Sequence, residues 1–600
     1  MPKVKLSDYI FDYLSSKRIK DVFMVSGGGA MHLVDSVGRN HKLKYYCFHH
    51  EQAASMAAEG YKRASGKMPL VLVTSGPGGT NTITGVIGQW LDSVSCVYIS
   101  GQVKFSTTIA SCPELKLRQL GDQEINIIDI VKPITKYAFL IKDPHSIRYH
   151  LQKALYLAQE ARPGPVWLDI PLDVQSALID TDKLKSFKPP KKTSGSLLKK
   201  QVAKLVEMLM AAKSPVILAG QGIKISGSRG IFNSVINKLR IPVLTSLCAV
   251  DLLPEKNAFY AGRPGTIGTR FGNFVLQNAD LLISVGTRNN IRQTGYNWGC
   301  FAKRSKKIFV DIDSAELKKP TVKADLTICA DAGCFLVELK KQISKVLLPD
   351  WSSWLSWAKD RRKMYPVVMK DYRCKDKPVN PYCFIQDLTA NLGNNDVLVT
   401  GNGTASVVCY QAGIVSGKQR FVSNSGCASM GYDLPASIGA SISLGKTPVV
   451  CLAGDGSLQM NIQELQTLVH YKLPVKVFVL NNNGYISIRQ TQDNFFNSRY
   501  VGSSKESGVS CPDILKVAKA YGLATERINS HKDMARKIKD ILSSKKAFVC
   551  EVAVSDKQPF APKVSSVKNS DGSIVSSSLE NMAPFLSKKE LEGNIYDARE

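Results

Sequence analysis

Two turns in the C-terminal third of the chain carry side chains that could hold a metal ion beside a phosphate. The apolar segment Val449–Leu452 is followed by A-G-D-G-S, and the apolar segment Val475–Leu480 is followed by N-N-N-G-Y. The glycines of the first turn let a phosphate approach the backbone closely. Asp455 and Asn482 supply hard oxygen ligands, which Mg²⁺ prefers next to a phosphate. A lone G-D-G is most often an ordinary turn, so the specificity comes from its pairing with the N-N turn after the next predicted strand.

A glutamate in the first third of the chain is a second candidate for chemistry. The segment H-H-E-Q-A-A-S-M-A-A-E-G-Y places Glu51 after the apolar residues 45–48 and at the start of an alanine-rich helix. A glutamate there often does no more than interact with the positive end of the helix dipole. A carboxyl group in that position can also act as a general acid. The residues alone leave both interpretations open.

Helix-like and strand-like patterns alternate almost throughout the chain. Apolar strands are predicted in all three parts, for example at Leu70–Thr74, Leu281–Val285 and Val475–Leu480, and an amphipathic helix at Leu6–Ser16. This alternation predicts an α/β protein with three doubly wound parallel-sheet domains. In such sheets ligands gather at the carboxyl ends of the strands, and the turns described above fall there.

Changes in composition divide the chain into blocks. The segment K-L-K-S-F-K-P-P-K-K-T-S-G-S-L, residues 183–197, is typical of a linker, and a polar, tryptophan-rich stretch covers residues 351–377. We expect the last part of the chain to be a Ser- and Lys-rich tail that folds over its own protein or over a neighbour. The predicted units are residues 1–183, 198–348 and 378–556 and the tail 557–600.

The overall composition excludes several classes of protein. The 14 cysteines form no C-x-x-C pair, so neither a zinc site nor a dithiol motif is expected. The net charge is +29, but the basic residues collect in short runs without interleaved aromatic residues, which favours a solvated surface over a nucleic-acid site. No apolar run reaches the roughly 18 residues of a membrane helix, and residues 1–5 do not begin a signal peptide. We therefore expect a cytoplasmic protein that binds neither nucleic acid nor membrane.

The segment G-D-G-S-L-Q-M-N-I-Q-E-L-Q-T-L-V-H-Y-K-L-P-V-K-V-F-V-L-N-N-N-G-Y resembles the fingerprint of thiamine-diphosphate enzymes, which opens with G-D-G and closes with N-N. In their order, and over roughly residues 4–555, the three blocks resemble the acetolactate synthase family. The resemblance implies a pyrimidine-binding first domain, a central FAD- or nucleotide-type domain and a pyrophosphate-binding third domain. It also implies Mg²⁺ held by Asp455, Asn482 and the Gly484 carbonyl. Glu51 would hydrogen-bond the aminopyrimidine ring and start catalysis.

Further site residues follow only from this resemblance. The family builds its site between the first domain of one chain and the third domain of another, which implies a homodimer or homotetramer. Met430 would be the bulky residue that holds the cofactor in a bent form. The implied catalytic residues are Glu51, Gln123 and Gly29. The implied contacts to thiamine diphosphate are Gly28, Pro77, Asn81, Asn402, Gly403, Thr404, Met430, Gly454, Gly456, Ser457, Tyr485 and Ile486.

The middle block is similar to the FAD-binding domain of acetolactate synthases. It contains the turns L-A-G-Q-G, V-G-T-R-N-N-I-R and I-F-V-D-I-D, each of which could equally be an ordinary α/β turn. Asn290 stands where the family usually has an acidic residue. We predict a structural, non-redox FAD. The matching positions are Gly220, Gly222, Ser246, Leu247, Gly286, Arg288, Arg292, Asp311 and Ile312.

The expected substrate pocket departs from the acetolactate synthase pattern. Asp122 replaces a phenylalanine next to Gln123, Leu172 replaces a lysine, and Thr491 replaces a tryptophan. Arg489 lies just before Thr491 and is either a bidentate ligand for a carboxylate or phosphate or a solvated arginine. Aromatic walls are lost and polar groups are gained, which fits a larger, hydroxylated or anionic acceptor.

The sequence therefore predicts a thiamine-diphosphate-dependent carboligase. It would decarboxylate pyruvate or a related 2-keto acid and transfer the acetyl carbanion to a keto acceptor, as acetolactate synthases do. One alternative is acetyl transfer to a nucleotide-linked keto sugar, and another is a 2-keto acid decarboxylase or oxidase on the same scaffold. A non-catalytic nucleotide-binding homologue is a third alternative, and Glu51, Asp455 and Asn482 argue against it.

Overall fold

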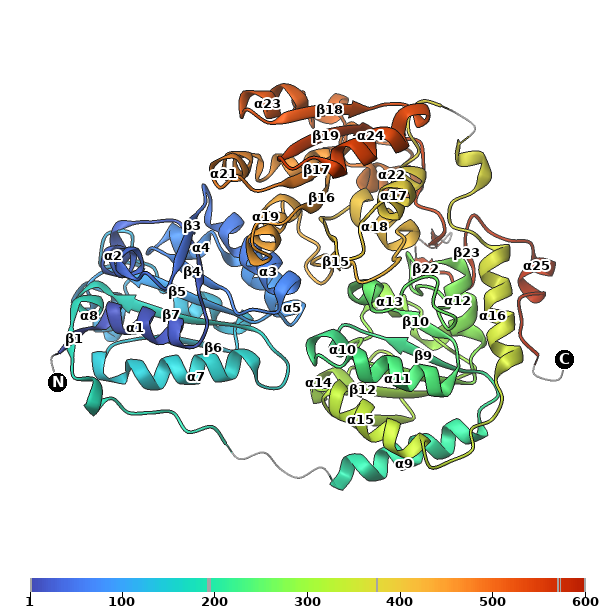
Figure 1. Ribbon diagram of the computed structural model, residues 1–600, viewed down its shortest axis with the longest axis horizontal. Helices are drawn as coiled ribbons and strands as arrows, with labels where there is room; N and C mark the ends of the chain where they lie inside the picture. The colour runs from blue at the N-terminus through green and yellow to red at the C-terminus, as the bar shows by residue number, and fades with distance from the viewer. Residues whose placement is uncertain (1–2, 191–195, 374–375, 569–570, 572, 598–600) are drawn as a thin grey trace.

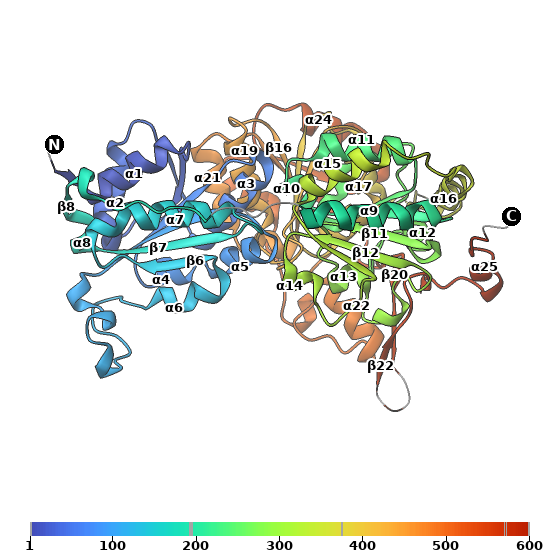
Figure 2. The same cartoon turned by 90° about the horizontal axis from the view of Figure 1, so that it is seen from below.

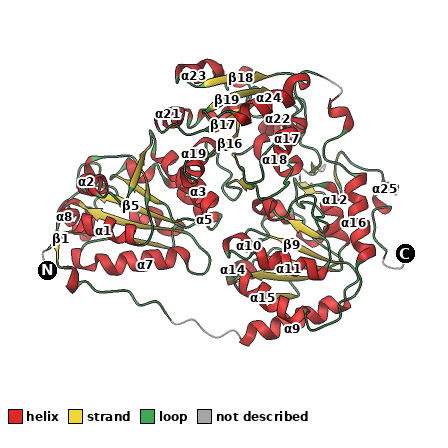
Figure 3. Ribbon diagram, viewed as in Figure 1, coloured by secondary structure: helices red, strands yellow, loops and turns green. Residues whose placement is uncertain are grey.

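Three parallel β-sheets, each covered by helices, make up the protein (Figures 1 and 3). The computed structural model describes residues 3–190, 196–373, 376–568, 571 and 573–597. In Figure 1 the N-terminal domain is blue to cyan, the middle domain green to yellow-green and the C-terminal domain yellow to red. The predicted α/β class with three doubly wound sheets is confirmed. Within the described residues, no helix combines the length and the apolar character needed to cross a membrane.

The N-terminal domain is built on a six-stranded sheet with the order β3-β2-β4-β5-β7-β6. Its central strands are fully buried runs of mainly apolar residues, as expected for a parallel sheet covered on both faces. The strands are β2 (Asp21–Met24), β3 (Lys44–Cys47), β4 (Leu70–Val73), β5 (Cys96–Gln102), β6 (Tyr137–Leu140) and β7 (Pro165–Pro171), with the separate pair β1 (Val4–Lys5) and β8 (Leu178–Ile179). The helices are α1 (Leu6–Ser16), α2 (Met31–Arg39), α3 (Glu51–Ser65), α4 (Pro77–Thr80), α5 (Ile83–Leu91), α6 (Ile127–Val131), α7 (Ile147–Gln159) and α8 (Leu172–Ser176).

The C-terminal domain repeats this topology with the order β15-β14-β16-β17-β19-β18. All its strand pairs are parallel, so the carboxyl ends of its strands share one edge. The strands are β14 (Val397–Thr400), β15 (Arg420–Val422), β16 (Val449–Gly454), β17 (Val475–Asn481), β18 (Ala524–Ile528) and β19 (Phe548–Ala553). The helices are α17 (Pro381–Ala390), α18 (Thr404–Ala412), α19 (Asp433–Ser443), α20 (Asp455–Gln459), α21 (Leu465–His470), α22 (Ile486–Phe495), α23 (Ile514–Ala520) and α24 (His531–Ser543).

The middle domain has a five-stranded parallel sheet with the order β10-β9-β11-β12-β13. The strands are β9 (Pro215–Ala219), β10 (Val243–Thr245), β11 (Leu281–Val285), β12 (Lys306–Asp311) and β13 (Leu326–Cys329). The helices are α9 (Ser196–Ala211), α10 (Gly222–Ile225), α11 (Arg229–Leu239), α12 (Arg270–Asn278), α13 (Ile291–Thr294), α14 (Ser314–Leu317) and α15 (Ala332–Ile343), followed by α16 (Ser352–Met364). The predicted linker at 183–197 includes residues 191–195, which lie outside the described residues.

Helices α3 and α19 join the N-terminal and C-terminal domains and lie side by side at the centre of the molecule (Figures 1 and 2). Glycines allow this close approach. A Cβ atom at Gly60 would collide with the carbonyl oxygen of Ala436, and one at Gly439 would collide with that of Ala57. The two helices therefore pack backbone against backbone, which fixes the position of Glu51 at the start of α3 relative to the C-terminal domain.

The tail after residue 556 packs on the middle domain of its own chain. The sequence analysis left open whether the tail folds over its own protein or over a neighbour. The Arg270 guanidinium donates to the carbonyl oxygens of Met582 and Pro584, and the ring of Tyr596 lies 4.8 Å from that of Trp354. Helix α25 (Lys588–Glu592) lies beside α16 in Figure 1. The tail also forms the short pairs β20 (Lys563–Val564) with β23 (Met582–Ala583) and β21 (Ser566–Lys568) with β22 (Ile574–Ser576), the second of which projects from the body in Figure 2.

Candidate active site

The carboxyl edge of the C-terminal sheet brings the predicted metal ligands together. Asp455 follows β16, and its two carboxylate oxygens accept from the backbone N–H groups of Gly456 (2.8 Å) and Gly484 (3.0 Å). Asn482 follows the neighbouring strand β17 and is buried. Its amide nitrogen donates to the hydroxyl of Thr404 at 3.2 Å. The turns after β14, β16 and β17 therefore meet at one place, as the parallel arrangement requires.

One buried acceptor at this place has no hydrogen-bond partner. The side-chain oxygen Oδ1 of Asn482 is enclosed, and no described group donates to it. An unpaired buried carbonyl costs free energy of about 1–3 kcal/mol, whereas a cation coordinated there would satisfy it. The neighbouring Asp455 carboxyl is half-buried, and its partial desolvation raises its pKa. A divalent cation would favour the ionised form of Asp455, so the donor set fits a hard metal ion.

The other predicted residues of the C-terminal domain surround this cluster. Gly403 precedes α18 with φ of 62°, and Asn402 adjoins it, half-buried. A Cβ atom at Gly456 would collide with the ring of Tyr485, so the glycine is required for packing. Ile486 begins α22 and is buried. By contrast, a Cβ atom at Gly454 would meet no atom within 4 Å, which leaves room for a ligand beside that turn.

Ser457 and Met430 lie on the inner side of this edge. The hydroxyl of Ser457 donates to the Asp433 carboxylate and accepts from the backbone N–H of Gly431 at 2.9 Å. Met430 is half-buried in the turn directly before Gly431. Desolvation raises the pKa of the buried Asp433 to about 6. Asp433 was missed by sequence reasoning, since a carboxylate at the start of a helix has ordinary explanations.

The carboxyl edge of the N-terminal sheet joins two other predicted residues. Glu51 is the first residue of α3, and its carboxylate accepts from the side-chain amide of Asn81 at 3.0 Å. The C-terminal domain holds the residues on both sides of Glu51. The Glu464 carboxylate accepts from the backbone N–H of His49 at 3.1 Å, and the Asn461 amide donates to the side chain of Gln52 at 3.1 Å. Glu51 is thus held between fixed neighbours.

The glycine turns beside Glu51 are closely packed. A Cβ atom at Gly29 would lie 2.6 Å from the Ser75 hydroxyl, and the Gly29 carbonyl accepts from the Gln175 amide at 2.8 Å. Pro77 begins α4. Gly28, in contrast, has no atom within 4 Å of an added Cβ. Gln175 is buried and was not identified from the sequence, because a glutamine in a short helix carries no motif.

The predicted substrate residues fall at both edges. Gln123 and its neighbour Asp122 are exposed on the loop that follows β5, and Gln123 has φ of 57°. Leu172 begins α8 and is half-buried. Thr491 is exposed on α22. Arg489 is neither free nor solvated, since its side chain is 12% exposed and donates to the backbone carbonyl of Asn482 at 2.5 Å.

The two carboxylates of the expected site have separate partners within one chain. Glu51 accepts from Asn81, and Asp455 accepts from Gly456 and Gly484. Among the described hydrogen bonds and ion pairs, none links the Glu51 and Asp455 carboxylates. Each edge therefore presents one half of the constellation that the sequence predicts.

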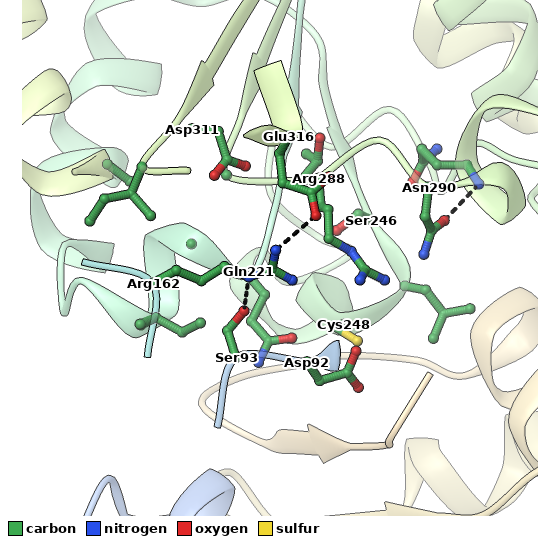
Figure 4. A pocket seen from close by; sticks show the side chains of 18 of the residues that line it. Asp92, Ser93, Arg162, Gln221, Ser246, Cys248, Arg288, Asn290, Asp311 and Glu316 are labelled. Atoms are coloured by element: carbon green, nitrogen blue, oxygen red, sulfur yellow. Dashed lines mark hydrogen bonds and ion pairs between the residues drawn. The ribbon is translucent and has the colours of Figure 1, made fainter. Parts of the chain in front are cut away.

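A pocket in the middle domain collects most of the predicted flavin positions (Figure 4). It encloses about 1090 Å³ free of protein atoms, including the part open to solvent. Gly220 does not line it. A Cβ atom there would collide with the carbonyl of Gly286, so that glycine has a packing role. The predicted residues that line the pocket are Gly222, Ser246, Leu247, Gly286, Arg288, Arg292, Asp311 and Ile312.

The N-terminal domain closes one side of this pocket, which sequence reasoning missed. Figure 4 shows Asp92, Ser93 and Arg162 facing the middle-domain residues. The Arg162 guanidinium donates to the Ser93 hydroxyl at 2.9 Å and pairs with the Glu316 carboxylate at 2.8 Å. Burial raises the pKa of Asp311. No sequence pattern marks these N-terminal residues, because they lie on loops of a different block.

A buried ion cluster also links helix α3 to the pocket residue Asp92. The Arg63 guanidinium contacts the Glu59 carboxylate at 2.8 Å and the Asp92 carboxylate at 2.7 Å, and all three side chains are at most 7% exposed. Desolvation raises the pKa of Glu59 to about 7. A signal was present in the sequence, since Glu59 and Arg63 are oppositely charged residues four apart in an alanine-rich helix.

Comparison with known proteins agrees with the three-domain fold. Residues 4–127 match the N-terminal TPP binding domain of thiamine pyrophosphate enzymes, residues 202–339 match the central domain, and residues 401–552 match the C-terminal TPP binding domain. The chain therefore belongs to the thiamine pyrophosphate enzyme family.

Its relatives within this family are acetolactate synthases. The chain is 31% identical to the acetolactate synthase large subunit of Cyanidium caldarium, over 93% of this chain and 95% of the relative. It is 32% identical to the probable acetolactate synthase large subunit of Methanocaldococcus jannaschii, over 92% of both. The acetolactate synthase isozyme 3 large subunit of Escherichia coli (strain K12) is 31% identical, over 88% of this chain and 90% of the relative. The predicted resemblance is confirmed.

Proposed function

We propose that this protein is a carboligase that removes carbon dioxide from a 2-keto acid such as pyruvate and transfers the acyl carbanion to a keto acceptor. The observation that carries the proposal is the pair of half-sites described above. One holds a carboxyl group hydrogen-bonded by an amide, Glu51 with Asn81, and the other holds a buried oxygen cluster, Asp455 with Asn482. Both lie at the carboxyl edges of sheets in a chain that belongs to the thiamine pyrophosphate enzymes.

The C-terminal half-site would hold Mg²⁺ and the diphosphate of the cofactor. The Asp455 carboxylate, the unpaired Oδ1 of Asn482 and the Gly484 carbonyl would bind the metal. Gly484 has φ of 121°, which a residue with a side chain rarely adopts. The open space beside Gly454 is available to the diphosphate.

The N-terminal half-site would orient the cofactor and move a proton. Bound thiamine diphosphate supplies the carbon nucleophile and the electron sink for the acyl group. Glu51 would donate a hydrogen bond to the aminopyrimidine ring and hold the proton that the reaction requires. Asn81 fixes the other carboxylate oxygen at 3.0 Å, so Glu51 is pre-oriented.

A complete site would need two copies of the chain. We propose that the Glu51 edge of one copy faces the Asp455 edge of a second copy, which makes the homodimer the smallest active unit and permits a homotetramer. The absence of a described contact between Glu51 and Asp455 in one chain supports this arrangement. Analytical ultracentrifugation of the active protein should give a dimer or a larger closed assembly; an active monomer would reject the arrangement.

The middle-domain pocket would hold FAD in a structural role. It contains the arginines Arg288 and Arg292 for phosphates, and it places the half-buried Asp311 at a strand end, where a ribose hydroxyl could bind. The purified protein should be yellow, and its flavin should remain oxidised during turnover. A colourless protein that gains neither stability nor activity from added FAD would exclude this part of the proposal.

The acceptor is either a second keto acid or a nucleotide-linked keto sugar. The exposed, polar Asp122 and Thr491 favour the larger and more hydroxylated acceptor. Enzyme, thiamine diphosphate, Mg²⁺ and pyruvate should release carbon dioxide. Mass spectrometry then identifies acetolactate, or a ligated product that forms only when a keto sugar is added.

The other outcomes of this assay identify the alternatives. Free acetaldehyde would indicate a decarboxylase, and oxygen uptake with hydrogen peroxide would indicate an oxidase. A protein that binds thiamine diphosphate but releases no carbon dioxide from pyruvate or other 2-keto acids would be a non-catalytic homologue, and the proposed function would be wrong.

A further inference from the structure

The loop between β5 and α6 is organised around one buried carboxylate that the proposed mechanism does not use. Glu124 is 6% exposed, although most of the loop around it is open to solvent. Its oxygen Oε1 accepts from the backbone N–H of Ile109 at 2.5 Å. Its oxygen Oε2 accepts from the backbone N–H groups of Leu120 (2.8 Å) and Gly121 (3.2 Å). A single side chain thus satisfies three backbone donors from two distant parts of the loop.

The ends of the loop are tied together at a second point. The side chain of Gln102, at the end of β5, accepts from the N–H of Val103 and donates to the carbonyl of Ile125, both at 3.0 Å. The same amide nitrogen donates to the buried Asp169 carboxylate, also at 3.0 Å. The loop is therefore closed at its base by Gln102 and held internally by Glu124, as in a compact Ω-loop.

These contacts determine where the predicted substrate residues lie. Gln123 directly precedes Glu124 and adopts the left-handed conformation with φ of 57°. Its carbonyl oxygen lies 2.6 Å from where a Cβ atom of Gly76 would be, so it packs against the glycine turn that precedes Pro77. The side chains of Asp122 and Gln123 are exposed next to that turn. Among the described hydrogen bonds, only those of Glu124 join residue 109 to residues 120–121.

We infer that Glu124 is a positioning residue for the reaction. Its carboxylate fixes the 103–125 loop and so presents Gln123 and Asp122 to the keto acid and the acceptor, without contacting either. The inference rests on the proposed function, because it assigns substrate contact to those two residues. Three charge-assisted hydrogen bonds from one carboxylate are strong enough to hold an otherwise exposed loop in one conformation.

The substitution Glu124→Gln tests this with little change of shape. The amide keeps one acceptor oxygen, but its NH₂ group faces backbone donors where the second oxygen was. The matched control is Glu114→Gln, the same chemical change at an exposed position of the same loop. We expect amide hydrogen exchange at Ile109, Leu120 and Gly121 to accelerate at least tenfold in E124Q and to stay unchanged in E114Q. Trypsin should also cut E124Q faster at Lys116 and Arg118.

Steady-state kinetics distinguish a positioning role of Glu124 from a merely structural one. In E124Q the KM for pyruvate should rise at least tenfold, while the Kd for thiamine diphosphate and Mg²⁺ stays within twofold of wild type. Faster exchange with an unchanged KM would overturn the inference, and so would unchanged exchange. If E124Q both raised the KM for pyruvate and lost thiamine diphosphate binding, the inference would also be overturned, because Glu124 would then support the whole domain.

A second variant keeps the test decisive if E124Q does not fold. In Gly121→Ala the added Cβ would lie 2.7 Å from the carbonyl of Thr107, so the loop must shift while the Glu124 carboxylate remains. G121A should raise KM in the same direction, and a wild-type KM in G121A would then reject the inference. If the wild-type enzyme itself releases no carbon dioxide from any 2-keto acid, the proposed function fails and this inference falls with it. A defect confined to the loop variants leaves the proposed function intact.

Discussion

The N-terminal and C-terminal domains have the same strand order but carry different residues at their carboxyl edges. In both, the strand that comes first in the sequence lies second in the sheet, and the last two strands are exchanged at the far edge. Equivalent strand ends carry different residues. The third strand leads to Gly76 and Pro77 in one domain and to Gly454 and Asp455 in the other. One topology therefore provides two edges of the same geometry, and the residues after the strands decide what each edge binds.

The two edges differ most in how they treat a carboxyl group. Asp455 is half-buried and accepts from two backbone N–H groups, an environment for a fixed negative charge and its counter-ion. Glu51 is half-buried and accepts from a neutral side-chain amide, which leaves one oxygen for a ligand. The C-terminal edge thus suits anchoring, and the N-terminal edge suits proton movement.

Removing the charge of Asp455 at the carboxyl edge of the C-terminal sheet should have the largest effect on activity. In Asp455→Asn the metal loses its carboxylate ligand, and the new NH₂ group opposes the N–H groups of Gly456 or Gly484. We expect activity to fall by about 10³-fold or more, since several kcal/mol of metal charge stabilisation are lost. Calorimetric titration should detect no tight binding of thiamine diphosphate with Mg²⁺. The control Asp540→Asn, on the exposed side of α24, should bind both normally; normal binding in D455N would contradict the assigned role.

Neutralising the other edge should separate catalysis from binding. Glu51→Gln keeps the side-chain shape and one acceptor oxygen for Asn81, but it removes the acid. The rate should fall by about 10²–10⁴-fold, the range for loss of a general acid. Thiamine diphosphate affinity and the melting temperature should stay close to wild type. A fully active E51Q would show that the two edges do not differ in the way proposed.

A substitution at the joint between the two domains tests how they are held. In Gly60→Ala the added Cβ meets the backbone carbonyl of Ala436, which cannot move without shifting α19. The free energy of unfolding should fall by about 1–3 kcal/mol, as for overpacked cores. The control is Gly38→Ala in α2, where a Cβ would have no atom within 4 Å. Urea unfolding of both variants makes the comparison, and equal stability would show that α3 and α19 are not tightly packed.

Each domain also buries a carboxyl group whose pKa is raised, and this predicts a pH dependence. Burial raises the pKa of Asp169 from 3.8 to about 7 in the N-terminal domain and that of Asp433 to about 6 in the C-terminal domain. The folded state therefore binds these protons more tightly than the unfolded state. The stability they contribute is complete below about pH 4 and is lost as the pH rises through about 6–7, by at most about 1.4 kcal/mol per unit for each group.

The substitution Asp169→Asn should remove the N-terminal part of this dependence. The slope of the unfolding free energy should become smaller over the whole range from about pH 4 to about pH 7, and only the contribution of Asp433, between about pH 4 and pH 6, should remain. Urea unfolding at a series of pH values measures this. A slope that is unchanged in D169N would mean that Asp169 stays ionised in the folded protein.

Sequence patterns predicted the strands that lead into the site better than the others. The segments before Asp455 and Asn482 are long, apolar and β-branched, and they appear as β16 and β17 with nearly the predicted limits. The sequence analysis did not identify β7 (Pro165–Pro171), whose two prolines resemble turn residues. The weakly apolar edge strands β6 and β18 were missed as well, because an edge strand needs less apolar surface than a central one.

Some residues could not have been found without the fold. In the sequence, Arg162 lies in a segment typical of a surface loop. In the structure, this N-terminal-domain residue closes one side of the middle-domain pocket. In the sequence, Glu124 is indistinguishable from the other charged residues of a polar loop. Only the structure shows that its buried carboxylate accepts from three backbone N–H groups. Such contacts depend on residues far apart in the chain, which local patterns do not encode.

The amino-acid sequence alone determined which chemical groups this protein has and which strands they follow. Asp455 and Asn482 adjoin their strands directly, and parallel strands bring their carboxyl ends to one edge whatever else the fold does. Only the tertiary structure decided how the three domains of the chain pack against one another. The glycine contacts between α3 and α19 set the distance between the two domains, and the loops around the middle pocket come from separate blocks. Packing between distant segments depends on the shapes of both surfaces at once, so no single stretch of sequence contains it.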